Sequence, residues 1–179
     1  MKRPPPSLKA QALALLARRE HSRAELRGKL LAHARKRAQA LALAAGALGA
    51  GPGEAEPAVA PFDAEAAASE VDAVLDALEA ARHLSDARFA ESRVHARAAR
   101  QGTARIRQEL ARHGVALDAD TARRLKDTEA ERARAVWQRK YGGTPPADPA
   151  ERARQMRFLA GRGFAPEVIR RVVGGRDDD

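Results

Sequence analysis

Six arginines lie within twenty residues in the middle of the chain, and their guanidinium groups could bind phosphates or carboxylates. They are Arg93, Arg97, Arg100, Arg105, Arg107 and Arg112. The first three are spaced by four and three residues, which places them on one face of a helix, and Arg105 and Arg112 share a face of the next predicted helix. A planar guanidinium binds oxyanions with a fixed orientation as well as with charge. Because only Glu109 opposes them within this stretch, the pattern predicts a surface that contacts a polyanion.

Arginines also surround the helix breaks in two other parts of the chain. The full set of predicted contacts is Arg18, Arg19, Arg23, Arg93, Arg97, Arg100, Arg105, Arg107, Arg112, Arg162 and Arg170. A simpler interpretation is that these arginines neutralise nearby acids, which are Glu70, Glu79, Asp86 and Glu91. Neutralisation accounts for some of the arginines, but the acids are too few to account for all of them.

The residues that usually carry catalysis are present without the spacing that catalysis needs. The five histidines are scattered, and no His-Glu-x-x-His pair occurs. The glycine-rich segment 46–51 lacks the Gly-Lys-Ser/Thr that would follow in a phosphate-binding loop. The chain contains no cysteine, which excludes thiol nucleophiles and thiolate metal ligands. We therefore predict no enzymatic activity, no catalytic residues, no cofactor and no metal.

Composition indicates an all-α protein with a polyanionic partner. Alanine and arginine dominate, and aromatic residues make up only 3% of the 179 residues, so helix is favoured over strand. The formal net charge is +9, and basic, acidic and basic blocks follow one another along the chain. This excess of basic residues suggests nucleic acid or an acidic protein surface as the partner. Without a signal peptide or a membrane span, we expect a cytoplasmic protein.

A helix-break-helix phrase occurs three times. Leu26, Ile106 and Ile169 align, and Leu30, Leu110 and Val173 align four positions later. Ser22, Gly102 and Ala165 then occupy the break. A short repeated unit of this kind buries its apolar face only against neighbouring helices. The predicted fold is all-α, with three tandem three-helix repeats and about nine helices. We expect the repeats to form an elongated arrangement, either straight or curved.

Caps and breaks place the expected domains. We predict a partial first repeat at 7–37, an Ala/Gly/Pro-rich insertion or linker at 38–68, a second repeat at 69–117, a third at 118–174 and a disordered acidic tail at 175–179. Ser22 with Glu25, and Thr128 with Glu131, have the spacing of capping boxes. Asp148-Pro149 marks another helix start.

The phrases resemble a known family, the RecX regulatory proteins. Leu84-Ser85-Asp86-Ala87-Arg88-Phe89-Ala90, followed by Gly102-x-x-Arg105-Ile106-x-x-Glu109-Leu110-x-x-x-Gly114, is similar to the central repeat of that family. Arg18-Arg19-Glu20-His21-Ser22-x-x-Glu25-Leu26-x-x-Lys29-Leu30 resembles its first repeat, and Arg157-Phe158-Leu159-x-x-Arg162-Gly163-Phe164 resembles its third. The resemblance covers about residues 8–33 and 71–173, and the chain departs from it at residues 34–68.

The resemblance implies tandem three-helix modules and a regulator that binds the RecA recombinase filament and inhibits its activities. On this interpretation the partner is the filament, with the DNA inside it as a second contact, and the chain is a monomer that binds no membrane. Several weak contacts in register would add up through avidity. One alternative is a helix-turn-helix-like DNA-binding repressor that reads bases through Arg105, Arg107 and Gln108. Another is a nonspecific nucleic-acid chaperone with steeply salt-dependent affinity.

Overall fold

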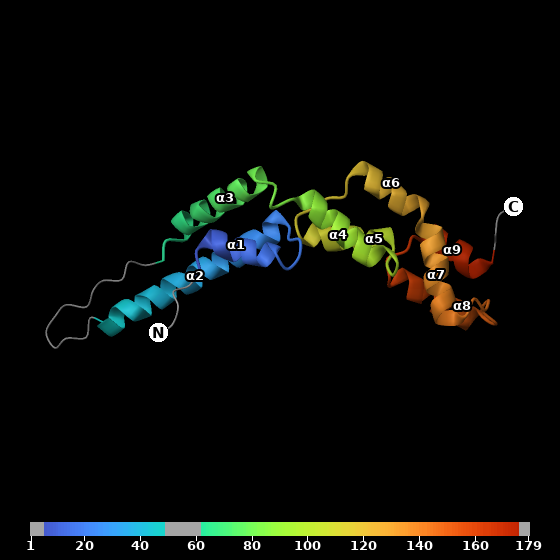
Figure 1. Ribbon diagram of the computed structural model, residues 1–179. Coiled ribbons are helices and arrows are strands. Elements are labelled where there is room, and N and C mark those ends of the chain that lie inside the picture. Colours follow the sequence, from blue (N-terminus) through green and yellow to red (C-terminus); the bar gives the residue numbers. More distant parts are fainter. Residues whose placement is uncertain (1–5, 49–61, 176–179) are drawn as a thin grey trace. The chain divides into compact units, whose positions relative to one another are not determined.

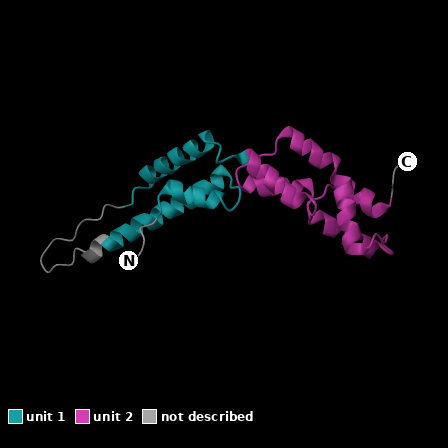
Figure 2. Ribbon diagram, viewed as in Figure 1, with its two compact units in different colours: residues 1–86 teal, residues 87–179 magenta. Residues whose placement is uncertain are grey.

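The described part of the molecule is entirely helical. A computed structural model describes residues 6–48 and 62–175, which form nine α-helices and no strand (Figure 1). They are α1 (Leu8–Leu16), α2 (Arg23–Leu48), α3 (Ala64–Ala80), α4 (Asp86–Ala98), α5 (Thr103–Arg112), α6 (Ala119–Asp127), α7 (Glu129–Tyr141), α8 (Pro149–Ala160) and α9 (Pro166–Gly174). The chain divides into two compact units, residues 1–86 and 87–179, and each is described separately below (Figure 2).

Unit 1 is a three-helix bundle of α1, α2 and α3. Its core residues are Leu8, Ala12, Leu26, Leu30, Val71, Leu75, Leu78 and Leu84, and each is at most 3% exposed. The predicted stripe of Val71, Leu75 and Leu78 on α3 therefore faces inward, as helical periodicity requires. Ser22 accepts a hydrogen bond from the N–H of Glu25 at 3.1 Å, and Asp86 accepts one from the N–H of Arg23 at 2.7 Å. Both bonds satisfy free amides at the start of α2.

Ion pairs join α2 to the acidic helix α3. Arg23 contacts Asp76 at 2.7 Å and Glu79 at 2.6 Å. Arg27 donates two hydrogen bonds to the carboxylate of Asp72, from Nε to Oδ1 at 2.7 Å and from Nη2 to Oδ2 at 2.9 Å. The acidic block of the sequence thus neutralises arginines of the preceding helix.

Two expected boundaries need correction. Residues 38–48 continue α2, and residues 64–68 already belong to α3, so the insertion predicted at 38–68 is helical at both ends. Helix α3 packs against α1 and α2 rather than opening the second repeat at residue 69. The alanine-rich stretch after residue 37 extends the helix because alanine has the highest helix propensity. The rest of the expected linker (49–61) and nearly all of the expected acidic tail (176–179) lie outside the described residues.

A partly buried carboxylate, that of Glu25, organises the first turn of α2. The expected reach of Glu25 back toward Ser22 is replaced by pairing with Arg19, with His21 at 3.2 Å and with Lys29 at 3.7 Å. Burial raises the pKa of Glu25. The hydrogen bond from Arg19 and the charges of His21 and Arg19 outweigh that effect and hold the pKa at about 2. Burial lowers the pKa of His21 below its ordinary 6.5, against the opposing pull of Glu25.

This cluster should make the stability of unit 1 depend on pH. Because the pKa of folded Glu25 is about 2 against an ordinary 4.5, its contribution is complete above pH 4.5 and is lost as the pH falls toward 2. We expect a loss of up to about 3 kcal/mol over that range. Protonation of His21 below its ordinary pKa adds to the loss, because the folded state disfavours the charged imidazole.

Hydrogen exchange of the α2 amides would measure this dependence. In Glu25→Gln the protection factors of these amides, which are the rates corrected for intrinsic exchange at each pH, should already be lower at neutral pH and should change less between pH 4.5 and 2. Trp137, the single tryptophan of the chain, lies in unit 2, so its fluorescence serves as an internal control. Equal acid dependence in the parent and in Glu25→Gln would contradict the assignment.

Unit 2 contains two hydrophobic cores. The first joins α4, α5 and α6 through Phe89, Ala90, Ile106, Leu110, Val115 and Leu125. The second joins α7, α8 and α9 through Ala133, Val136, Trp137, Leu159, Phe164, Ile169, Val172 and Val173. The aligned pairs of the sequence phrase are all buried, in α2, α5 and α9. Together with the bundle of unit 1, these cores confirm the predicted all-α repeat fold.

The third copy of the phrase is completed differently from the first two. In the first two triplets the phrase forms the first and second helices, and the third helix (α3 or α6) follows it. In the last triplet the phrase forms α8 and α9, and α7, which precedes it, packs most extensively against α9. A helix pair needs one further helix to cover its apolar face, and the covering helix can come from either side of the phrase.

The capping predictions in unit 2 had mixed outcomes. Asp148 accepts a bond from the N–H of Glu151 at 2.7 Å and caps α8, as expected. The expected capping box at Thr128 is wrong, because the Thr128 hydroxyl donates to the carbonyl of Arg124 at 2.8 Å and makes no capping bond to α7. Thr128 is both the C-cap of α6 and the N-cap of α7, and its hydroxyl is hydrogen-bonded to the last turn of α6. Among the described helices, none has both the length and the apolar character of a membrane span.

Candidate polyanion-binding site

The second and third copies of the helix break meet at two glycines within unit 2. The N–H of Gly102 donates to the carbonyl of Arg162 at 2.9 Å, and the N–H of Ala104 donates to that of Gly163 at 3.3 Å. A Cβ added at Gly102 would lie 2.1 Å from the Gly163 oxygen, and one at Gly163 would lie 2.6 Å from the backbone nitrogen of Arg105. Only glycine permits so close an approach of two backbones. The contact fixes Arg100, Arg105 and Arg162 around one junction.

A buried carboxylate and a guanidinium complete the junction. Glu129, 4% exposed, accepts bonds from the N–H of Thr103 at 3.1 Å and of Ala165 at 3.3 Å. It therefore caps α5 and α9 together, where the helix dipole favours negative charge. Arg132 donates to the carbonyls of Ala98, Gln101 and Leu125 at 3.0, 2.6 and 2.7 Å. Arg132 thus joins α7 of the third repeat to three backbone carbonyls of the second repeat.

Five of the predicted contact arginines have partners within the fold. Arg19 pairs with Glu25, and Arg23 pairs with Asp76 and Glu79. Glu109 lies 3.7 Å from Arg93 and 3.2 Å from Arg97, and Arg93 also lies over the ring of Phe89. The fifth, Arg162, lies over the ring of Phe158, 3.8 Å from its centre. Of the four acids expected to neutralise these arginines, only Glu79 forms an ion pair with one of them among the described residues, and its partner is Arg23. Arg93 and Arg97 are neutralised by Glu109 instead.

The other six predicted contacts are exposed and form no ion pair with a described residue. They are Arg18, Arg100, Arg105, Arg107, Arg112 and Arg170. Arg105 and Arg112 are two turns apart on α5, and Arg100 lies just before its N-terminus. Exposed cations without an internal partner are available to an external polyanion.

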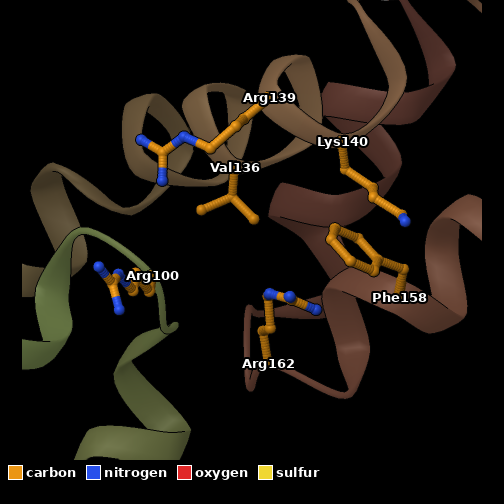
Figure 3. A pocket seen from close by; sticks show the side chains of 6 residues that line it. All are labelled: Arg100, Val136, Arg139, Lys140, Phe158 and Arg162. Atoms are coloured by element: carbon orange, nitrogen blue, oxygen red, sulfur yellow. The ribbon is translucent and has the colours of Figure 1, made fainter.

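A cavity of about 210 Å³ adjoins the junction, and we call it the α7–α8 pocket. Val136 and Phe158 form its apolar part, and the remaining lining residues are Arg100, Arg139, Lys140 and Arg162. Figure 3 shows Val136, Arg139 and Lys140 on α7, Arg100 on the segment after α4, and the Arg162 guanidinium turned toward the Phe158 ring. Four cations and no acidic side chain line this cavity among the described residues.

Sequence reasoning missed Arg139, Lys140 and Phe158. Arg139 and Lys140 are adjacent at the end of α7, where basic residues commonly complement the helix dipole, so their sequence position alone does not indicate a binding site. Three other aromatic residues of the third repeat pack in its core or against it. Trp137 and Phe164 are buried in the core, and Tyr141 packs edge-on against Phe158. Of the residues that line this site, only Arg100 and Arg162 were in the predicted set. Both could be found from the sequence because each lies next to a helix break.

Comparisons with known proteins identify the family. Residues 85–119 match the family described as "RecX, second three-helix domain", and residues 127–173 match "RecX, third three-helix domain". The "Regulatory protein RecX" of Ralstonia pickettii (strain 12J) is 43% identical over 178 residues, covering 98% of this chain and 92% of that protein. The chain belongs to the RecX family. Another RecX protein, from Leptothrix cholodnii, is 45% identical over 173 residues, with coverage of 96% and 90%.

A solved RecX structure has the same fold. The crystal structure of RecX from Lactobacillus salivarius superposes with a TM-score of 0.58 and 16% identity, covering 94% of this chain and 93% of that one. The RecX relatives are named regulatory proteins. Their near-complete coverage extends the resemblance to the stretch at residues 34–68 where the motifs alone departed from it.

Proposed function

We propose that this RecX-family chain binds the RecA recombinase filament and inhibits its activities, and so modulates recombination and DNA repair. The observation that carries the proposal is 43% identity to a named regulatory protein RecX over 98% of the chain. The exposed arginines of unit 2 support a polyanionic partner, with acidic filament surface and the enclosed DNA as the two contacts. In this proposal the chain is a cytoplasmic monomer without catalytic activity or a cofactor.

The mechanism is steric in this proposal. One helix of ten residues is only about 15 Å long, so a single repeat reaches little of a filament. Successive repeats in one chain contact it at several points, and each contact raises the effective concentration of the next. A chain bound across adjacent subunits would block the movement that turnover or monomer addition requires.

A repressor function is less well supported. A recognition helix enters the major groove with its N-terminal residues. The first N–H groups of α5 instead donate to the break of the third repeat and to Glu129, so they are not free to contact a DNA phosphate. Footprinting on genomic DNA should accordingly give no defined site, whereas a repressor would protect one.

Titration of the chain into RecA on single-stranded DNA tests the proposed function. ATP hydrolysis should fall at fewer than one chain per recombinase subunit, because one bound chain affects several subunits. Addition to preformed filaments without free DNA separates inhibition from sequestration of DNA. Unchanged hydrolysis at equimolar chain would refute the proposal.

A further inference from the structure

The α7–α8 pocket combines four positively charged side chains with two apolar ones. Its volume of about 210 Å³ is several times the roughly 30 Å³ that one water occupies in the liquid. A bare anion would therefore leave most of the cavity unfilled. It would also gain nothing from Val136 and Phe158, the two apolar side chains among the lining residues.

The lining favours a nucleic acid over an acidic peptide. Peptides bind through a sheet edge, as a helix in a long apolar groove, in an aromatic-lined polyproline groove or, when acidic, at an arginine cluster, and this last mode relies on charge rather than on stacking. The described residues of unit 2 form no strand, and only two apolar side chains line the pocket. The guanidinium of Arg162 lies 3.8 Å from the centre of the Phe158 ring, and nucleic-acid bases stack on both aromatic rings and guanidinium planes.

We propose that the α7–α8 pocket takes one unstacked base of a single-stranded nucleic acid. The base stacks on the Arg162 guanidinium, which itself lies over the Phe158 ring, and the flanking phosphates contact Arg100, Arg139 and Lys140. In a duplex the bases are stacked and paired, and extracting one costs free energy. The pocket therefore gives the chain a preference for single strands. This inference depends on the proposed function in one respect only, which is that the single strand bound in the cell is the DNA within the filament.

A comparison of ligands tests the inference without recombinase. The probes are a fluorescent thymidine oligomer of about 16 nucleotides, an abasic oligomer of equal length that keeps every phosphate, and a duplex of the same length. By fluorescence anisotropy, the intact chain should bind the abasic oligomer at least about fivefold more weakly than the thymidine oligomer. One stacked base contributes at least that factor to the affinity. The duplex should lose the same contribution from the base.

Variants of the chain then locate the base. Phe158→Leu keeps an apolar side chain and should remove the difference between the thymidine and abasic oligomers. The double variant Arg139→Gln/Lys140→Gln should weaken both oligomers together and reduce the salt slope by about 1.4. Arg123→Gln/Lys126→Gln removes the same charge from α6, outside the pocket, and is the matched control. Thermal unfolding of each variant checks that the fold persists.

Three results would overturn the inference. The first is equal affinity of the intact chain for the thymidine and abasic oligomers, which would leave only an electrostatic contact. The second is a full difference between the oligomers in a folded Phe158→Leu. The third is binding of an acidic peptide, and not of the oligomers, that depends on Arg139 and Lys140. Each result is independent of the recombinase titration, so inhibition of ATP hydrolysis could persist while this inference fails.

Discussion

Gly102→Ala is expected to destabilise unit 2 by about 3 to 5 kcal/mol. The new methyl carbon would lie 2.1 Å from the carbonyl oxygen of Gly163, so the two breaks must separate. Separation breaks two interrepeat backbone bonds, at about 1 kcal/mol each, and adds overpacking strain of about 1 to 3 kcal/mol. Urea unfolding followed by Trp137 fluorescence measures the loss, because this tryptophan lies in the core of the third repeat.

Gly28→Ala is the matched control for this prediction. Gly28 lies inside α2, and an added Cβ would meet nothing within 4 Å. Because alanine is favoured over glycine in a helix interior, unit 1 of this variant should be more stable by about 0.5 to 1 kcal/mol. Circular dichroism measures this change, because Trp137 lies in unit 2. The same substitution thus has opposite signs at the two glycines. Stability of Gly102→Ala within about 1 kcal/mol of the parent would contradict the close docking of the two breaks.

Reversal of three exposed arginines should abolish inhibition of the recombinase without unfolding the chain. The variant Arg100→Glu/Arg105→Glu/Arg112→Glu replaces two residues on one face of α5 and the one before its N-terminus. Arg97 is left unchanged because it pairs with Glu109. Opposed like charges across an interface cost several kcal/mol. We expect the concentration for half-maximal inhibition to rise about 100-fold or more.

Net charge needs its own control. Lys9→Glu/Lys36→Glu/Lys126→Glu changes the formal charge by the same amount at exposed positions outside the predicted set. This variant should keep most of its inhibition, with a modest loss from long-range attraction. Circular dichroism confirms the helix content of both variants. Full inhibition by the Arg100/Arg105/Arg112 variant, or equal loss in both variants, would show that these arginines are not the contact.

Local sequence signals were sufficient for the all-α class and for the aligned buried positions. Leu26, Ile106 and Ile169 could be aligned because a break followed by a fixed apolar spacing is a short-range pattern, and all three are buried. The start of α8 followed in the same way from Asp148-Pro149. No short-range pattern shows which helix covers the apolar face of a given helix pair. For this reason α3 was assigned to the second repeat, although it packs against α1 and α2.

By itself, then, the sequence determined an all-α chain with a repeated helix-break-helix phrase and an excess of basic residues, because periodicity, capping residues and charge act within a few residues of one another. The RecX family followed from the resemblance of its motifs. Tertiary structure decided which arginines remain exposed, since the partners of Arg23 lie more than fifty residues away. It also decided that two glycine breaks touch and that Arg100 and Phe158 share one cavity. Such contacts depend on how helices pack against each other, and no local spacing encodes that packing.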